Sequence, residues 1–165
     1  GKSVFGWNED FRQDPHYLLE NEMRIDYKNK NLINSKETHL HDAEFLGFSY
    51  DFENNFIRFE MVEYDFKKKF KLTFHNVFGF KMSSCDFWGK CLRVDCWYAD
   101  DENGLIHELN RLKEEKRGKL VDGSLGPAFS RMDEVESILQ VTISIISGDL
   151  LTIVCEYIDF EEETL

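Results

Sequence analysis

Apolar and polar residues alternate along most of this chain after residue 43, which is the period of half-buried β-strands. Turn residues separate the alternating stretches: Glu53–Asn55 and Ser147–Asp149 both favour tight hairpins. Short strands at this spacing are typical of an antiparallel sandwich or a partly open barrel. The seven predicted strands present their apolar faces over Leu46–Phe52, Ile57–Met61, Phe66–Phe74, Phe78–Met82, Leu92–Tyr98, Leu139–Ile145 and Leu151–Tyr157.

Two stretches break this pattern with helical features. An N-cap aspartate and a proline at residues 14 and 15 predict an N-terminal helix from His16 to about Lys28. Leucines at positions 105, 109 and 112 share one helical face and predict an inserted helix within Gly104–Lys116.

The remaining segments are irregular. Gly118–Asp133 is a long loop of the kind that is functional or disordered in compact domains. Glu161–Glu163 is expected to be a frayed acidic tail. We therefore predict a single α+β domain over 1–165 that is predominantly β. In it, residues 1–41 form a helix and loop segment, and residues 42–160 form a β-rich core.

The charge of the chain is strongly negative. It has 20 Lys and Arg against 32 Asp and Glu, a net charge of −12. Such a charge repels nucleic acid and anionic membranes, and no apolar run approaches the roughly 20 residues of a membrane span. We therefore expect neither nucleic acid nor membrane as a partner, whereas a basic protein such as a toxin domain would be attracted. An acidic surface also serves solubility alone.

The four cysteines, Cys85, Cys91, Cys96 and Cys155, do not follow a common zinc-binding spacing. Cys96 and Cys155 fall at predicted core positions, so we expect free thiols in a reducing cytosol. We expect no signal peptide. Gly1, in place of an initiator methionine, indicates a remnant of cleavage. These features predict a cytoplasmic protein.

The densest group of potential ligands lies just before the first predicted strand. His39 and His41 are two residues apart, so both imidazoles can lie on one face of an extended segment. Asp42 or Glu44 supplies a carboxylate, and His75 follows a later strand. Two histidines and a carboxylate suit iron or zinc. This set predicts a small metal-dependent β-barrel enzyme, although its spacing departs from the His-x-His motif of the cupin superfamily.

A structural role for the same residues is the competing interpretation. Asp42 can cap a turn by accepting backbone N–H groups. His41 can hydrogen-bond to a neighbouring strand, because buried and half-buried polar groups are normally paired. The cluster would then fix the start of the first sheet strand. The chain contains no nucleophile elbow, P-loop, dinucleotide fingerprint or His-Glu-x-x-His motif, so we expect no cofactor and favour a protein that is not an enzyme.

Two motifs resemble a known family. His41-Asp42-Ala43 precedes the first alternating strand, and Leu72–Phe80 contains a Phe-x-x-Val hinge between two later strands. These motifs resemble small uncharacterised bacterial proteins that include the YxiG-like group. The resemblance spans roughly Leu40–Met82. Several related families are encoded beside polymorphic toxins and are thought to be immunity proteins, so the resemblance implies a toxin-neutralising role.

These observations favour a cytosolic, non-enzymatic binding protein with a binding surface on acidic loops. The candidate binding residues are Asp100, Asp101 and Glu102, together with the Gly118–Asp133 loop. Aromatic residues on the faces opposite the predicted core form either a partner surface or contacts with a second sheet. They are Phe45, Phe56 and Trp97.

Overall fold

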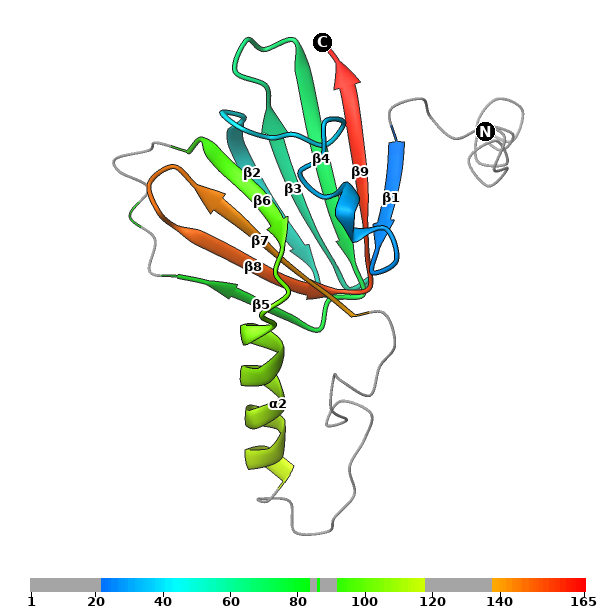
Figure 1. The fold of residues 1–165 in the computed structure, drawn as a ribbon, viewed down its shortest axis with the longest axis vertical. Coiled ribbons are helices and arrows are strands. Elements are labelled where there is room, and N and C mark those ends of the chain that lie inside the picture. The colour runs from blue at the N-terminus through cyan, green and yellow to red at the C-terminus, as the bar shows by residue number, and fades with distance from the viewer. Residues whose placement is uncertain (1–21, 84–85, 87–91, 118–137) are drawn as a thin grey trace, which may run out of the picture.

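The computed structural model describes residues 22–83, 86, 92–117 and 138–165 (Figure 1). These residues form two antiparallel sheets, which confirms the predicted predominantly β, sandwich-like architecture. The five-stranded sheet has the order β1 (Glu22–Asp26), β9 (Tyr157–Thr164), β4 (Lys68–His75), β3 (Phe56–Val62) and β2 (Glu44–Asp51). The four-stranded sheet has the order β5 (Gly79–Met82), β8 (Leu150–Cys155), β7 (Leu139–Ile145) and β6 (Val94–Ala99). The helical elements are α2 (Gly104–Arg117) and the 3-10 helix η3 (Lys30–Leu32).

Two chain segments pass from one sheet into the other. β4 leads into β5 after a bend at residues 76–78, and β8 leads into β9 through Glu156. Because β4 pairs with β9 and β5 pairs with β8, the sheets share a corner, seen where the orange β8 meets the red β9 in Figure 1. The sheets meet again through a bridge between Glu44, in β2, and Arg93, just before β6.

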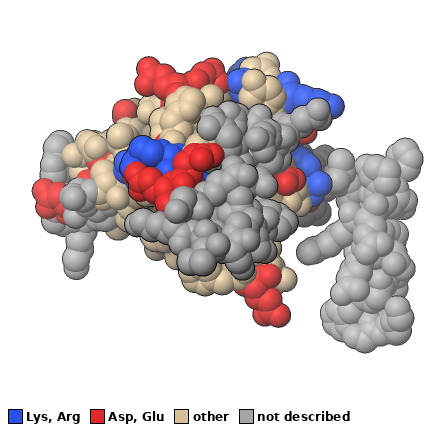
Figure 2. All heavy atoms as spheres, turned by 90° about the horizontal axis from the view of Figure 1, so that it is seen from below, with Lys and Arg blue, Asp and Glu red and all other residues tan. Residues whose placement is uncertain are grey.

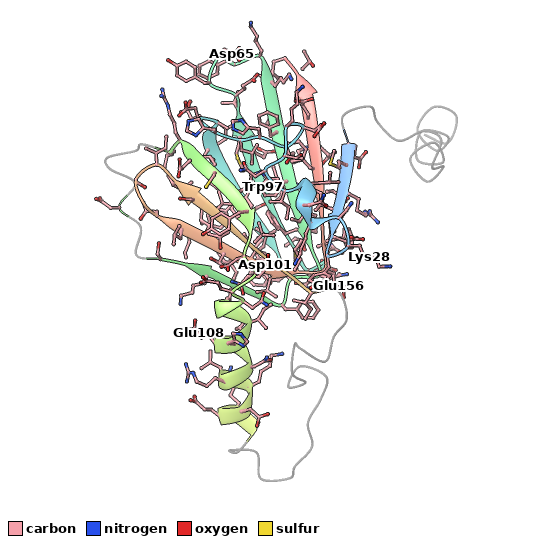
Figure 3. All side chains as sticks on the ribbon, in the orientation of Figure 1. Lys28, Asp65, Trp97, Asp101, Glu108 and Glu156 are labelled. Carbon is pink, nitrogen blue, oxygen red and sulfur yellow. The ribbon has the colours of Figure 1, made fainter. Side chains whose placement is uncertain are left out.

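Aromatic side chains fill the space between the sheets. Trp97, Phe59 and Phe74 are fully buried, and Figure 3 shows Trp97 between the two layers. The Phe59 and Phe74 rings meet edge to face with centroids 5.4 Å apart, and the Trp97 ring stacks on Phe160 at 6.0 Å. Such pairs contribute roughly 0.5–1.5 kcal/mol beyond the burial of their area. Phe45, Phe70 and Phe160 are buried in the same core.

Two β-bulges reverse the predicted faces of Leu46 in β2 and of Tyr98 in β6, whereas Phe48, Tyr50 and Val94 keep theirs. The bulge between Phe45 and Gly47 turns Phe45 into the core and leaves Leu46 54% exposed. The bulge between Val94 and Cys96 turns Trp97 inward and Tyr98 outward. A bulge inserts one unpaired residue, so each side chain beyond it changes face.

Of the three aromatic residues assigned to a possible partner surface, two lie in the core and one lies outside it. Phe45 and Trp97 contact the second sheet and are core residues, so for them the partner-surface alternative is wrong. Phe56 is half-buried and is paired across the sheet with His75, outside the core.

The predicted N-terminal helix is wrong for the part that the structure describes. Residues 22–26 form β1 and pair with β9, and residues 16–21 lie outside the described residues. Met23 and Ile25 alternate with Glu22, Arg24 and Asp26, which is a strand period, and pairing with β9 buries Ile25 completely. Sheet pairing therefore outweighs the local helix-start signal.

The C-terminal acidic segment is also more ordered than predicted. Glu161–Glu163 lies within β9, which is paired with β4 on one side. Glu161 and Glu163 stand directly opposite Lys71 and Lys69 in the register. Opposite charges on facing positions favour this pairing, so the segment is a strand and not a frayed tail.

Helix α2 confirms the inserted helix predicted from the leucine spacing. Leu105 and Ile106 pack with Val154 on the outside of the four-stranded sheet, and Phe78 and Leu109 add to this cluster. No helix among the described residues is long and apolar enough to cross a membrane. The Gly118–Asp133 loop lies outside the described residues.

Candidate functional site

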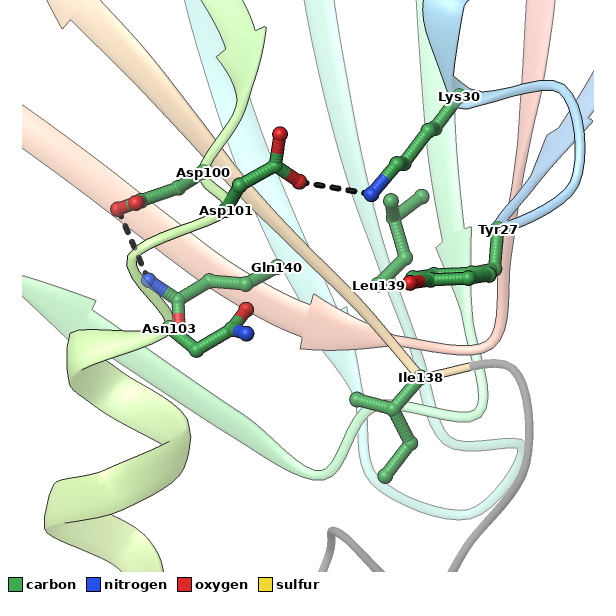
Figure 4. Close-up of a pocket in the computed structure, with 8 residues that line it drawn as sticks. All are labelled: Tyr27, Lys30, Asp100, Asp101, Asn103, Ile138, Leu139 and Gln140. Carbon is green, nitrogen blue, oxygen red and sulfur yellow. Dashed lines mark hydrogen bonds and ion pairs between the residues drawn. The ribbon is translucent and has the colours of Figure 1, made fainter.

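A small polar pocket lies where the connection between β6 and α2 approaches the end of β1 (Figure 4). Its volume is about 170 Å³. Two of the acidic residues predicted to bind a partner, Asp100 and Asp101, line it. The other lining residues are Tyr27, Lys30, Asn103, Ile138, Leu139 and Gln140.

Asp100 anchors the wall of this pocket. Its Oδ2 accepts hydrogen bonds from Gln140 Nε2 at 2.9 Å and from Thr142 Oγ1 at 3.4 Å, and its Oδ1 accepts one from the Glu102 backbone N–H at 3.1 Å. The buried Gln140 in turn accepts the Ile106 backbone N–H at 3.1 Å. This network satisfies a backbone donor in the first turn of α2, which has no partner within the helix. Asp100 is therefore a structural residue.

Asp101 and Glu102 project outward from the same connection. The Asp101 carboxylate accepts a hydrogen bond from Lys30 Nζ at 2.7 Å, yet its side chain is 74% exposed. Lys30 Nζ also lies 4.3 Å from the centre of the Tyr27 ring. The bond to Asp101 raises the pKa of Lys30. Glu102 follows in the chain and is exposed, but it does not line the pocket.

The segment Thr38–Ala43, here called the edge segment, lies along the outer edge of β6. The Asp42 N–H donates to the Val94 carbonyl, and the Val94 N–H donates to the Ala43 carbonyl, both at 2.8 Å. The indole N–H of Trp97 donates to the Thr38 carbonyl at 2.7 Å. The segment therefore supplies hydrogen-bond partners that a further strand would otherwise provide.

His41 adds a side-chain contact to this pairing of the edge segment with β6. Its Nδ1 lies 2.9 Å from the Asp95 carbonyl oxygen, on the neighbouring strand, as the structural interpretation predicted. This backbone bond, and then the charge of Asp42, raises the pKa of His41. Asp42 itself adopts a left-handed φ of 64°, which aspartate tolerates in turns. The His39 ring lies 6.0 Å from that of His41, and both side chains are exposed.

His75 and Glu44 lie at opposite ends of the five-stranded sheet. His75 is paired with Phe56 at one end of β3, whereas Glu44 is paired with Val62 at the other end. Six residues of strand separate these positions, roughly 20 Å at about 3.3 Å per residue. The structure therefore does not bring His75 together with Glu44, and the hypothetical metal site is not assembled as predicted. Within the described ranges, no three His, Cys, Asp or Glu side chains are placed to hold a metal ion.

His75 instead joins an ion cluster on the outer face of the sheet, which the sequence reasoning missed. Its Nε2 lies 3.0 Å from Asp159 Oδ2. Arg24 Nε donates to the other oxygen of Asp159 at 3.1 Å. Strand alternation marks all three as outward residues, but their meeting depends on the pairing of β1 and β4 with β9. That pairing leaves no signal in local periodicity.

Aromatic rings continue this cluster across the sheet. The His75 ring stacks on Tyr157 with centroids 4.6 Å apart and lies 6.0 Å from Phe56. The guanidinium of Arg24 covers the Tyr157 ring at 4.3 Å, and that of Arg58 covers Phe56 at 4.9 Å. We call these five residues the aromatic row. Arg24 is exposed and the other four are half-buried, and their mutual contacts order all five side chains.

Comparisons with known proteins give little further guidance. No family model matches the chain, and no curated protein matches it. A solved structure described as an uncharacterized protein from Neisseria gonorrhoeae aligns with 85% of this chain and 96% of that chain, at 15% sequence identity and a TM-score of 0.34. A similarity of this size supports no inference about the function of this chain.

Proposed function

We propose that this protein acts by binding a basic protein partner, and that the partner is a toxin domain that it neutralises. The net charge of −12 supports this proposal, because complementary charge accelerates association. Residues 40–82 resemble a group of uncharacterised proteins with related families encoded beside toxins, and this resemblance supports a toxin domain as the partner. The proposed role requires no catalytic group.

The observation that carries the proposal is that two exposed carboxylates lie on a loop held in place by hydrogen bonds. Asp101 and Glu102 follow Asp100, whose N–H donates to the Gln140 carbonyl at 2.8 Å and whose carboxylate is held by three donors. On the other side, the Asn103 N–H donates to the Asp100 carbonyl at 3.3 Å. A loop fixed in this way loses little conformational entropy when it binds.

The acidic side chains do not form one continuous patch on the face shown in Figure 2. That view, from below, shows Asp and Glu in several separate groups with Lys and Arg among them. The charge surplus therefore acts as a long-range attraction, while local groups such as Asp101 and Glu102 orient the partner.

Affinity capture with a matched pair of variants tests the proposal. Tagged protein is used to recover binding proteins from cells of the organism that encodes it, and association rates are then measured with the recovered partner. Glu102→Lys and Glu53→Lys each change an exposed glutamate and bring the net charge from −12 to −10. We expect Glu102→Lys to lower the association rate about fivefold, the effect of roughly 1 kcal/mol, and Glu53→Lys to have a smaller effect.

Two outcomes would contradict the proposal. One is that the wild-type protein recovers no basic partner. The other is that the two variants slow association equally, because the effect would then follow from net charge alone. A third measurement, neutralisation of the partner's toxicity on co-expression, distinguishes immunity from other binding roles.

A further inference from the structure

The outer face of the five-stranded sheet offers a wider surface than the pocket. Helix α2 packs on the four-stranded sheet, and the described residues place no helix over the outer face of the five-stranded sheet (Figure 1). Asp26 belongs to this face and the next residue, Tyr27, lines the pocket. The face and the pocket therefore adjoin at the end of β1.

Charge on this face is unevenly distributed. The two strands at one side, β1 and β9, present five carboxylates and one guanidinium there. They are Glu22, Asp26, Asp159, Glu161, Glu163 and Arg24. On the β4 side, Lys71 and Lys69 face Glu161 and Glu163 and offset part of this negative charge. The carboxylates of β1 and β9 still outnumber the cations beside them, and this surplus favours a basic occupant.

The aromatic row supplies the second feature of an interface. Tyr157 and Phe56 are half-buried, and each is covered by an arginine on the same face. Aromatic residues and arginine dominate the energetically important positions of protein interfaces. Because the Tyr157 ring already stacks on His75 and the Phe56 ring lies beside it, binding would not need to order them.

A hollow beside the aromatic row supplies the third feature of an interface. It has a volume of about 280 Å³ and lies over Gly47 and Ser49, between Arg58 and Glu60. Gly47 has no side chain, and a β-carbon built there would meet nothing within 4 Å. The hollow is smaller than the roughly 300–1,000 Å³ of typical small-molecule sites. It suits one long side chain of a protein partner.

We propose that the outer face of the five-stranded sheet is the surface on which the basic partner docks. A cationic segment of the partner lies against β1 and β9, and one of its side chains enters the hollow over Ser49. This inference rests on the proposed function and locates its main contact. Glu102 then governs the rate of association, and the sheet face governs the rate of dissociation.

The test fills the hollow without removing any contact. Ser49→Trp adds a large side chain at an exposed position of β2, and His107→Trp adds the same side chain at an exposed position of α2, on the other sheet. Circular dichroism establishes that both variants are folded. Dissociation rates are measured with the protein recovered by wild-type capture. We expect Ser49→Trp to raise the dissociation rate at least about tenfold and His107→Trp to change it less than about twofold.

Hydroxyl-radical footprinting of the wild-type complex gives a readout that needs no variant. We expect the peptides that contain Tyr157 and Phe56 to lose reactivity when the partner is bound. Normal dissociation of folded Ser49→Trp, together with unchanged reactivity of Tyr157, would overturn the docking face and leave the proposed function standing. Recovery of no partner by the wild-type protein would overturn both.

Discussion

Replacing Trp97 with phenylalanine tests the hydrogen bond that attaches the edge segment to the core. The indole N–H donates to the buried Thr38 carbonyl at 2.7 Å, and no other donor to this oxygen is seen within the described residues. Phenylalanine keeps one aromatic ring in the core but cannot donate this bond. A buried carbonyl without a partner costs about 1–3 kcal/mol.

The lost burial adds to this cost. Phenylalanine has two fewer carbon atoms than tryptophan, and each buried carbon group contributes about 0.8 kcal/mol. Together the two effects predict that Trp97→Phe lowers the free energy of unfolding by about 3–5 kcal/mol. The neighbouring Tyr98 is 40% exposed, so Tyr98→Phe is a matched control that should change stability by less than about 0.5 kcal/mol.

Urea denaturation followed by far-ultraviolet circular dichroism measures both changes, because it does not depend on tryptophan fluorescence. The slope of the free energy against urea should stay unchanged, so that the midpoint alone reports stability. A loss below about 1 kcal/mol for Trp97→Phe would refute the reasoning. It would mean that the Thr38 carbonyl finds another donor or that the edge segment contributes little to folding.

Three further predictions concern packing, thiol chemistry and pH. Gly79→Ala places a methyl group against Leu109 and should lower the free energy of unfolding, measured in urea, by about 1–3 kcal/mol. In a Leu109→Ala background most of this loss should disappear. An equal loss in both backgrounds would argue against the contact. Burial raises the pKa of the Cys155 thiol, so iodoacetamide should alkylate it in urea but not in the native protein, and native labelling would show the site to be open. The backbone bond to the Asp95 carbonyl raises the pKa of His41, so its stabilising contribution is full below the unfolded pKa of about 6.5 and is lost as pH rises through the folded pKa. Proton NMR should place the His41 pKa above 6.5, and His41→Gln should remove this pH dependence; a lower pKa would contradict the bond.

Local patterns were sufficient to predict the central strands and α2. Hydrophobic alternation located β3 and β4 because each buries one face continuously, as Ile57, Phe59 and Met61 do. The hairpin between β2 and β3 was predicted from its asparagines, and Asn55 has the left-handed φ of 54° that such a turn needs. These features depend on neighbouring residues alone.

The bulges could not be predicted in the same way. Phe45 and Leu46 are both apolar, so the sequence does not indicate which of them enters the core. Cys96, Trp97 and Tyr98 present the same ambiguity. A single inserted residue decides the face, and its position depends on pairing with β3 and β7.

The candidate sites depended on long-range pairing. Lys30 meets Asp101 although 71 residues separate them, and no local period contains that contact. His75 was grouped with His41 by residue type, whereas the strand register places it beside Asp159. Charge and composition therefore indicated which residues are polar and exposed, but the register determined which of them meet.

The edge segment has a consequence for how the chain avoids self-association. An uncovered β6 would offer Val94 and its neighbours as a template for strands from other molecules, and the edge segment occupies both backbone groups of Val94. A variant without the edge segment would therefore leave β6 as an unpaired edge strand and form polymers by strand pairing between molecules. A synthetic peptide with the sequence of residues 38–43 would act as a chain terminator for such growth. The histidines and aspartate that make this stretch resemble a metal site thus belong to a segment that caps the edge of the four-stranded sheet.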